Sequence, residues 1–357
     1  MTITVNKFNL RTYFEYLMNC KRVVFMIVLL LQSFYGFTQS NLVSSIESAE
    51  IKWVGQFPAP NDSRLKQHHS FISILKTIIG VKRRRSSISY KPVGLLATSP
   101  DVFWFVDQNS ETIQRVDKNT CKPPPAFHRQ KFIFQSLVGL CSFTGKGILF
   151  TDSRLNKIFK LSNNQKSITE FNQEVTLNQP TGIAFSKRRA EVWVIETASH
   201  KVTIMDTLGK KIRSFGGRGA GNGEFNFPTS VWMDNKGFVY INDALNYRIQ
   251  IFDDLGNFIS SFGQAGNATG YFALPKSVAT DSYDDIYVVD ALLHTVQIFD
   301  KGGRFLLSFG SQGREKEKFW LPSSIYVDEH DYIYVADSYN ARIQIFKLDK
   351  IVLRHEN

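Results

Sequence analysis

Cysteine is scarce in this chain of 357 residues, which contains three: Cys20, Cys121 and Cys141. A small secreted fold that is held together by disulfides needs a much denser set of cysteines. Because Cys20 precedes an apolar segment that is typical of an export signal, a mature chain would keep Cys121 and Cys141. We expect these two residues to be unpaired, so the sequence predicts no disulfide framework.

The chain also lacks a long hydrophobic run. The apolar segment near its N-terminus, Val23–Leu31, has nine residues, whereas a membrane-spanning helix needs about 20. A basic pair precedes this segment, and small residues at Thr38 and Ser40 follow it, as in a signal peptide. We predict that residues 1–40 direct export, with an uncleaved membrane anchor as the alternative. The protein would then be periplasmic, secreted or anchored to the membrane.

Familiar catalytic motifs are missing as well. The sequence contains neither the Gly-x-Ser-x-Gly of many hydrolases nor the His-Glu-x-x-His of zinc peptidases. Gly216–Gly223 is rich in glycine, but it lacks the Gly-Lys-Ser/Thr ending of a phosphate loop and no strand-helix unit surrounds it. Similar glycine pairs recur near Gly263 and Gly310. We therefore interpret all three segments as loops that connect repeated units.

What the sequence does contain is a long repeat. A run of aliphatic and aromatic residues that ends in an acidic residue occurs six times, most clearly at Asp243, Asp290 and Asp337, which are spaced 47 residues apart. The earlier copies end at Asp107, Asp152 and Glu196. Units of this length that are built from short strands are typical of propeller blades.

The units divide into three or four short strands at Gly, Asn, Asp and Lys turns. They open at Pro92, Leu137, Pro180, Pro228, Pro275 and Pro322. Proline suits the first residue of a strand because it has no N–H to donate. We predict an all-β fold, a six-bladed β-propeller with four-stranded antiparallel blades, over residues 88–357, preceded by the N-terminal signal or anchor segment.

Residues 41–87 are expected to hold the strand that closes the ring, followed by an insertion. Ile51–Phe57 matches the outer strand of the fourth blade in sequence, so we favour it as the outer strand of the last blade. Lys350–Leu353 is the alternative for that position.

At this level of detail the chain resembles a known family. Its Pro-x-x-aliphatic, Tyr-Val-x-Asp and Arg-Ile-Gln-Ile-Phe motifs are similar to those of NHL repeats. Residues 51–350 resemble the exported six-bladed NHL propellers of bacteria, and the last three units carry the most specific motifs. The resemblance implies a rigid scaffold, which by itself names no ligand.

Some NHL propellers are peptidyl-hydroxyglycine lyases, and this resemblance bears on two histidines. The segment around His294 is similar to a zinc-ligand segment of those enzymes, and His200 occupies the equivalent position of another unit. The lyase pattern also needs histidines directly after the blade-opening residues, where this chain has Thr181, Thr229, Lys276 and Ser323. We therefore expect no metal, no other cofactor and no catalytic residue, and we keep a metal-dependent lyase or hydrolase as an alternative.

The recurring acidic residues have a structural interpretation. One active site needs one set of residues, whereas Asp or Glu returns at the same place in all six units. We expect these side chains to accept hydrogen bonds that fix turns.

The formal net charge of +11 favours an anionic partner or surface. Phe71–Ile79 has apolar residues at helical spacing, and the basic run Lys82–Arg85 follows it. We favour packing of Phe71–Ile79 across one face or flank of the propeller, and contact of the segment 71–85 with a membrane surface is the alternative. Nucleic-acid binding is not expected of an exported protein, although RNA binding would return as an option for a cytoplasmic one.

These observations favour a monomeric, non-catalytic binding scaffold of the cell envelope. It would recognise a protein or peptide through one face of the propeller. The candidate binding residues near the central mouth are Thr181, His200, Thr229, Tyr247, Lys276, His294 and Ser323.

Overall fold

The computed structural model describes residues 48–59, 90–118, 133–164 and 167–351. The predicted export segment (1–40), the 71–85 segment, Cys20 and Cys121 lie outside these ranges, so their predictions stay predictions. Among the described residues, no helix is both long enough and apolar enough to cross a bilayer.

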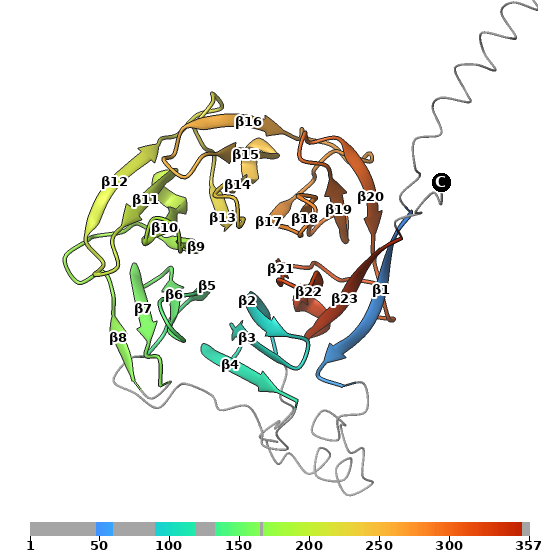
Figure 1. Cartoon of the computed structure of the whole chain (residues 1–357), viewed down its shortest axis with the longest axis horizontal. Coiled ribbons are helices and arrows are strands. Elements are labelled where there is room, and N and C mark those ends of the chain that lie inside the picture. The colour runs from blue at the N-terminus through green and yellow to red at the C-terminus, as the bar shows by residue number, and fades with distance from the viewer. Residues whose placement is uncertain (1–47, 60–89, 119–132, 165–166, 352–357) are drawn as a thin grey trace, which may run out of the picture. The chain divides into compact units, whose positions relative to one another are not determined.

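Six antiparallel sheets form a ring, and the predicted all-β, six-bladed propeller is confirmed (Figure 1). Blade 1 contains β2 (Pro92–Ser99), β3 (Val102–Asp107) and β4 (Thr112–Asp117). Blade 2 contains β5 (Leu137–Ser142), β6 (Ile148–Asp152), β7 (Lys157–Leu161) and β8 (Ile168–Glu170). Blade 3 contains β9 (Pro180–Ser186), β10 (Glu191–Glu196), β11 (Lys201–Met205) and β12 (Lys211–Gly216).

Blade 4 contains β13 (Pro228–Met233), β14 (Val239–Asp243), β15 (Arg248–Phe252) and β16 (Phe258–Phe262). Blade 5 contains β17 (Pro275–Thr280), β18 (Ile286–Asp290), β19 (Thr295–Phe299) and β20 (Phe305–Phe309). Blade 6 contains β21 (Ser324–Val327), β22 (Tyr332–Asp337), β23 (Arg342–Ile351) and β1 (Ser48–Phe57). The described residues give blade 1 three strands and each other blade four. Five innermost strands begin at the expected opening residue, and β21 begins two residues after Pro322.

The outer position of blade 6 is taken by β1, next to β23 (Figure 1). The indole N–H of Trp53 donates to Oε1 of Gln344 at 3.1 Å, and Arg342 donates to Oε1 of Gln56 at 3.3 Å. The N-terminal strand therefore joins the last blade, as the sequence comparison with the fourth blade favoured. Part of the alternative segment extends β23 as far as Ile351.

The hydrophobic core lies between neighbouring blades. Trp193 and Ile195 of β10 pack with Val239 and Ile241 of β14 around Phe225, which is fully buried. Because both faces of a blade are covered by its neighbours, middle strands such as β14 and β18 are buried at every residue. This explains why they read as continuous apolar runs rather than as alternating patterns.

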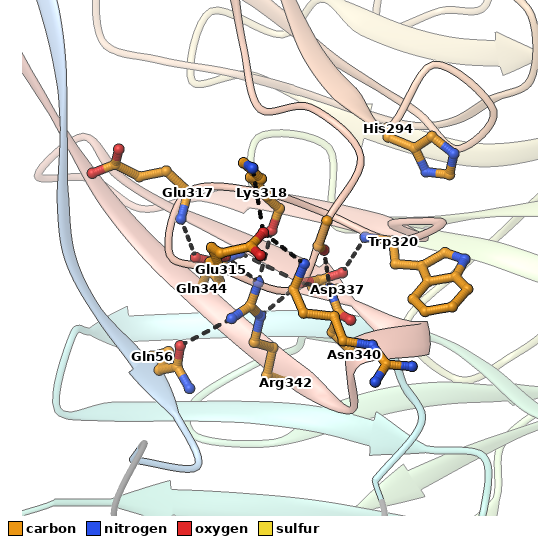
Figure 2. Close-up of polar contacts among 12 residues, drawn as sticks. Gln56, His294, Glu315, Glu317, Lys318, Trp320, Asp337, Asn340, Arg342 and Gln344 are labelled. Atoms are coloured by element: carbon orange, nitrogen blue, oxygen red, sulfur yellow. Dashed lines mark hydrogen bonds and ion pairs between the residues drawn. The ribbon is translucent and has the colours of Figure 1, made fainter.

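The recurring acidic side chains fix the turns between blades, which confirms their structural interpretation. Asp337 is fully buried and accepts hydrogen bonds from the backbone N–H of Trp320 and from Nε of Arg342, both at 2.7 Å (Figure 2). In the other blades Asp107, Asp152, Glu196, Asp243 and Asp290 accept from the backbone N–H groups of Lys91, Gln135, Asn178, Asn226 and Ala273. Each carboxylate thus holds the connecting segment against the turn of its own blade.

The glycine-rich segments are connecting loops, as predicted. Gly263 and Gly310 have positive φ angles of 103° and 90°, which other residues adopt only with strain. A Cβ atom at these positions would lie 2.4 Å from the ring of Phe272 and 2.3 Å from the ring of Phe319. The glycines therefore allow two fully buried phenylalanines to enter the space between blades.

Candidate functional site

One face of the propeller carries both the openings of the innermost strands and the turns that follow the buried carboxylates. These two positions pair in blades 1–5, as Pro228 does with Asp243, and in blade 6 the register begins two residues later with Ser324 opposite Ala336. We call this side the mouth face. Because all six innermost strands start there, each one runs from the mouth face towards the opposite end of the ring.

The innermost strands line a central cavity with a volume of about 570 Å³. Lys276 is the second residue of β17 and Thr280 is its last. At about 3.3 Å per residue, these two residues are separated by roughly 13 Å along the strand. Lys276 therefore lies at the mouth end of the cavity, and Thr280 lies at the same depth in the ring as the far end of the cavity.

Four of the seven predicted binding residues line this cavity: Thr181, Thr229, Lys276 and Ser323. The three hydroxyl groups also link successive blades. Thr181 donates to the carbonyl of Thr229 at 3.0 Å, Thr229 to that of Lys276 at 3.1 Å, and Ser323 to that of Pro92 at 3.1 Å. Their hydrogen bonds are thus partly structural, whereas Lys276 is the member with a free charged group.

Lys276 is half-buried and its ammonium group has no hydrogen-bond partner among the described residues. Burial lowers the pKa of this ammonium group, and the negative charge of Asp290 opposes the shift. Asp290 itself is fully buried and accepts from four backbone N–H groups. A half-buried cation without a paired anion costs stability, so it is a candidate for contact with a ligand.

His200, Tyr247 and His294 are not among the residues that line the cavity. They follow the turns after the buried carboxylates, with φ angles of 54°, 55° and 55°. Nδ1 of His200 accepts the N–H of Phe227, and Nδ1 of His294 accepts the N–H of Leu321, both at 3.1 Å. The sequence predicts all three near the central mouth, and in the structure each of the two histidines holds the opening of the next blade.

The equivalent turn position does the same work in two other blades. Oε2 of Glu111 accepts the N–H of Leu137 at 3.0 Å, and Oδ1 of Asn156 accepts the N–H of Gln179 at 2.8 Å. A shared acceptor function therefore explains why this position holds such different polar residues. Glu, Asn and His share no pattern that a sequence comparison would detect, so their common contact appears only in three dimensions.

Aromatic and apolar side chains close the far end of the cavity. Trp232 of β13 and Tyr326 of β21 meet edge to face, with ring centroids 5.2 Å apart. The indole N–H of Trp232 donates to Oγ1 of Thr280 at 2.9 Å. Phe185 and Met233 line the same region. The cavity is thus basic and polar at its mouth and apolar at its floor.

The mouth face also presents exposed apolar residues that the sequence analysis missed. They follow the buried carboxylates of blades 4–6 at the second position of each turn: Leu245 (42% exposed), Leu292 (54%) and Tyr339 (63%). Blades 1–3 have Asn109, Arg154 and Ala198 at this position. We call the three exposed residues of blades 4–6 the apolar arc. Comparison of the six repeats would have shown large apolar residues at this position in blades 4–6. The sequence of a turn does not show, however, whether its side chains are exposed.

The described residues contain no group of three or more His, Cys, Asp or Glu side chains that could hold a metal ion. Cys141 is a buried, free thiol, and burial raises the pKa of this thiol far above its usual range.

The comparisons with known proteins agree on the fold. A family model described as DUF5128, 6-bladed beta-propeller, matches residues 275–356. No curated protein sequence matches the chain. Among solved structures, an auxiliary nutrient binding protein from Bacteroides thetaiotaomicron is 14% identical with a TM-score of 0.58, and the match covers 73% of this chain and 70% of that one.

Two further structures have different roles. A catalytically inactive virginiamycin B lyase from Staphylococcus aureus, solved with quinupristin, is 11% identical with a TM-score of 0.55 over 87% of this chain and 90% of that one. A chain of the nidogen/laminin complex is 17% identical with a TM-score of 0.51 over 62% of this chain and 81% of that one. Identities this low show a shared fold and leave the NHL relationship a resemblance.

Proposed function

We propose that this protein is a non-catalytic binding scaffold of the cell envelope that recognises a protein or peptide through its mouth face. The apolar arc is the observation that carries the proposal. Exposed apolar groups on one rigid surface are typical of interaction sites. A few residues, most often Trp, Tyr and Arg, supply most of the binding energy at interfaces, which makes Tyr339 the strongest member of the arc.

The chemistry of the face suggests which partner it fits. Tyr339 and the half-buried Trp320 supply aromatic surface in blade 6 and the segment that precedes it, and the guanidinium of Arg314 lies 4.9 Å from the ring centroid of Trp320. The net charge of the chain is +11. We infer a partner segment with apolar side chains that insert at the arc and acidic groups beside them, because electrostatic complementarity selects such a segment.

The similar structures include both binding proteins and an enzyme, so they support a binding scaffold in general terms. A lyase of the metal-dependent type receives less support from the site, since Nδ1 of His200 and of His294 already accepts a backbone N–H. Location in the envelope rests on the sequence of residues 1–40. Fractionation of cells that express the full chain tests it, and recovery in the cytoplasm would count against export.

The partner is tested by crosslinked capture from the native envelope fraction. We compare the triple variant Leu245→Ser, Leu292→Ser, Tyr339→Ser with the matched triple Asn109→Ser, Arg154→Ser, Ala198→Ser. We expect the first to lose at least tenfold of the captured partner, as hot-spot truncation does, and the second to retain it. Equal capture by both triples would contradict the proposal. Metal analysis of the same eluate tests the lyase, which a stoichiometric metal without a protein partner would favour.

A further inference from the structure

We propose that the central cavity binds a small organic anion with an apolar body, whose carboxylate pairs with Lys276 and whose apolar part rests on Trp232 and Tyr326. This site lies inside the ring and shares one residue with the apolar arc, because Tyr339 is also among the residues that line the cavity. The inference therefore goes beyond recognition of a partner by the mouth face, and it does not depend on that partner.

The charged residues of the cavity wall favour a ligand with negative charge. Lys91 and Lys276 are the charged residues among those that line the cavity, and no Asp or Glu lines it. Asp290, which acts on Lys276 electrostatically, is fully buried and is already held by backbone N–H groups. An anion that enters the cavity thus meets a wall that contains two lysines and no carboxylate residue.

The hydroxyl groups of the wall add a second observation. Oγ of Ser230 is buried and has no hydrogen-bond partner among the described residues, and Ser230 lines the cavity next to β17. A buried polar atom without a partner is uncommon. The inaccessible hydroxyl of Ser230 and the ammonium of Lys276 thus both lack partners on neighbouring innermost strands of the described chain. Lys276 lines the cavity, so its ammonium is the group that a carboxylate would contact.

The opposite end of the cavity indicates that the part of the ligand away from its carboxylate is apolar. The edge-to-face pair of Trp232 and Tyr326 forms an aromatic floor, and Met233 adds a flexible apolar side chain. With about 570 Å³, the cavity falls within the range of roughly 300–1,000 Å³ found for small-molecule sites. A flat aromatic or branched aliphatic group of a carboxylic acid suits this floor, and the distance of roughly 13 Å from Lys276 to the floor sets the length of the ligand.

Two sources offer this chemistry: a free carboxylic acid and the C-terminal carboxylate of a peptide. The test therefore uses two matched pairs of probes. The first is 3-(4-fluorophenyl)propionate and its neutral amide. The second is an N-acetylated glycyl-glycyl-4-fluorophenylalanine with either a free or an amidated C-terminus. Binding to the purified full chain is followed by the ¹⁹F linewidth of each probe.

We expect at least one acid to bind about ten- to a hundredfold more tightly than its amide, because a hydrogen bond to a charged group gives a difference of this size. Lys276→Met should abolish this preference, and Lys276→Arg should keep most of it. Lys301→Met, which removes an equally charged but exposed lysine, should bind as the unmodified protein does. Tighter binding of the propionate indicates a free acid as the source, and tighter binding of the peptide acid indicates a chain terminus.

Three results would overturn the inference: no binding of either acid, equal binding of acid and amide, or an unchanged preference in Lys276→Met. Folding of each variant is checked by circular dichroism. The probes need no cellular partner, so a negative result with them does not bear on the capture experiment. A negative result in the capture experiment likewise does not bear on ligand binding in the cavity.

Discussion

Blades 4–6 and blades 1–3 share one strand order but differ in how their innermost strands approach one another. The second residue after each blade opening is Gly94, Gly139 and Gly182 in blades 1–3, and Ser230, Ser277 and Ser324 in blades 4–6. A Cβ atom on Gly139 would lie 2.1 Å from the carbonyl oxygen of Thr181. The first half of the ring is therefore packed backbone against backbone, and the second half has room for side chains.

The two halves also differ on the mouth face and between the blades. Phe225, Phe272 and Phe319, all fully buried, precede blades 4, 5 and 6, and the apolar arc follows in the same blades. The same position, three residues before the opening, holds Phe134 in blade 2 and Leu177 in blade 3, and both are buried. Ahead of blade 3, Asn172 also accepts the N–H of Ile158 at 2.7 Å. The comparison shows that a propeller needs the period and the buried carboxylate, while the side chains between blades are free to differ.

The largest difference is expected from the carboxylates. Asp337→Ala should lower the free energy of unfolding by about 3–5 kcal/mol, because it leaves the guanidinium of Arg342, which is 7% exposed, buried without its carboxylate. Asp107 accepts from Lys91 and Ser110 and pairs with no arginine of the described ranges, so Asp107→Ala should cost about 1–3 kcal/mol. Urea unfolding followed by circular dichroism measures both. Equal losses would show that the arginine adds nothing to blade 6.

A smaller effect is expected from exchanging the small residues of the two halves. Gly139→Ser should cost about 1–3 kcal/mol, because its Cβ would collide with backbone that a rotamer change does not move. The reverse change Ser277→Gly should cost about 0.5–1 kcal/mol, mainly through the greater freedom of the unfolded chain. The same unfolding measurement compares them. If Gly139→Ser proved the milder change, the two halves would be packed alike.

The smallest effect concerns Lys276 and depends on pH. Burial lowers the pKa of this lysine in the folded state, so at pH 7 its charge destabilises the fold relative to the unfolded chain. This penalty is relieved as pH rises from the folded pKa to the ordinary pKa of 10.5. Lys276→Met should therefore raise stability at pH 7 by less than the losses above, and the gain should shrink towards pH 10.5.

Thermal unfolding at several pH values between 7 and 11 tests this expectation. Lys301→Met is the control, since Lys301 is exposed. A gain that stays constant with pH would assign the effect to the added apolar surface of methionine rather than to the lost charge.

Much of the architecture was predictable because it repeats. The spacing of Asp243, Asp290 and Asp337 gave the period, the acidic residue of every unit indicated a turn-fixing acceptor, and Ile51–Phe57 matched an outer strand. The candidate site was predictable in part. Thr181, Thr229, Lys276 and Ser323 follow blade openings and reach the cavity, whereas His200 and His294 lie one turn away and bind backbone N–H groups.

The sequence by itself thus determined the fold class, the number of blades and the structural meaning of the acidic residues, since these depend on local patterns that recur along the chain. Tertiary structure alone decided which side chains from different blades meet at the centre of the ring. Trp232 and Tyr326 come from blades 4 and 6 and are 94 residues apart in the chain, yet their rings touch across the floor of the cavity. Only closure of the ring brings them together, because the geometry of six packed sheets, and no local pattern, sets the distance between innermost strands.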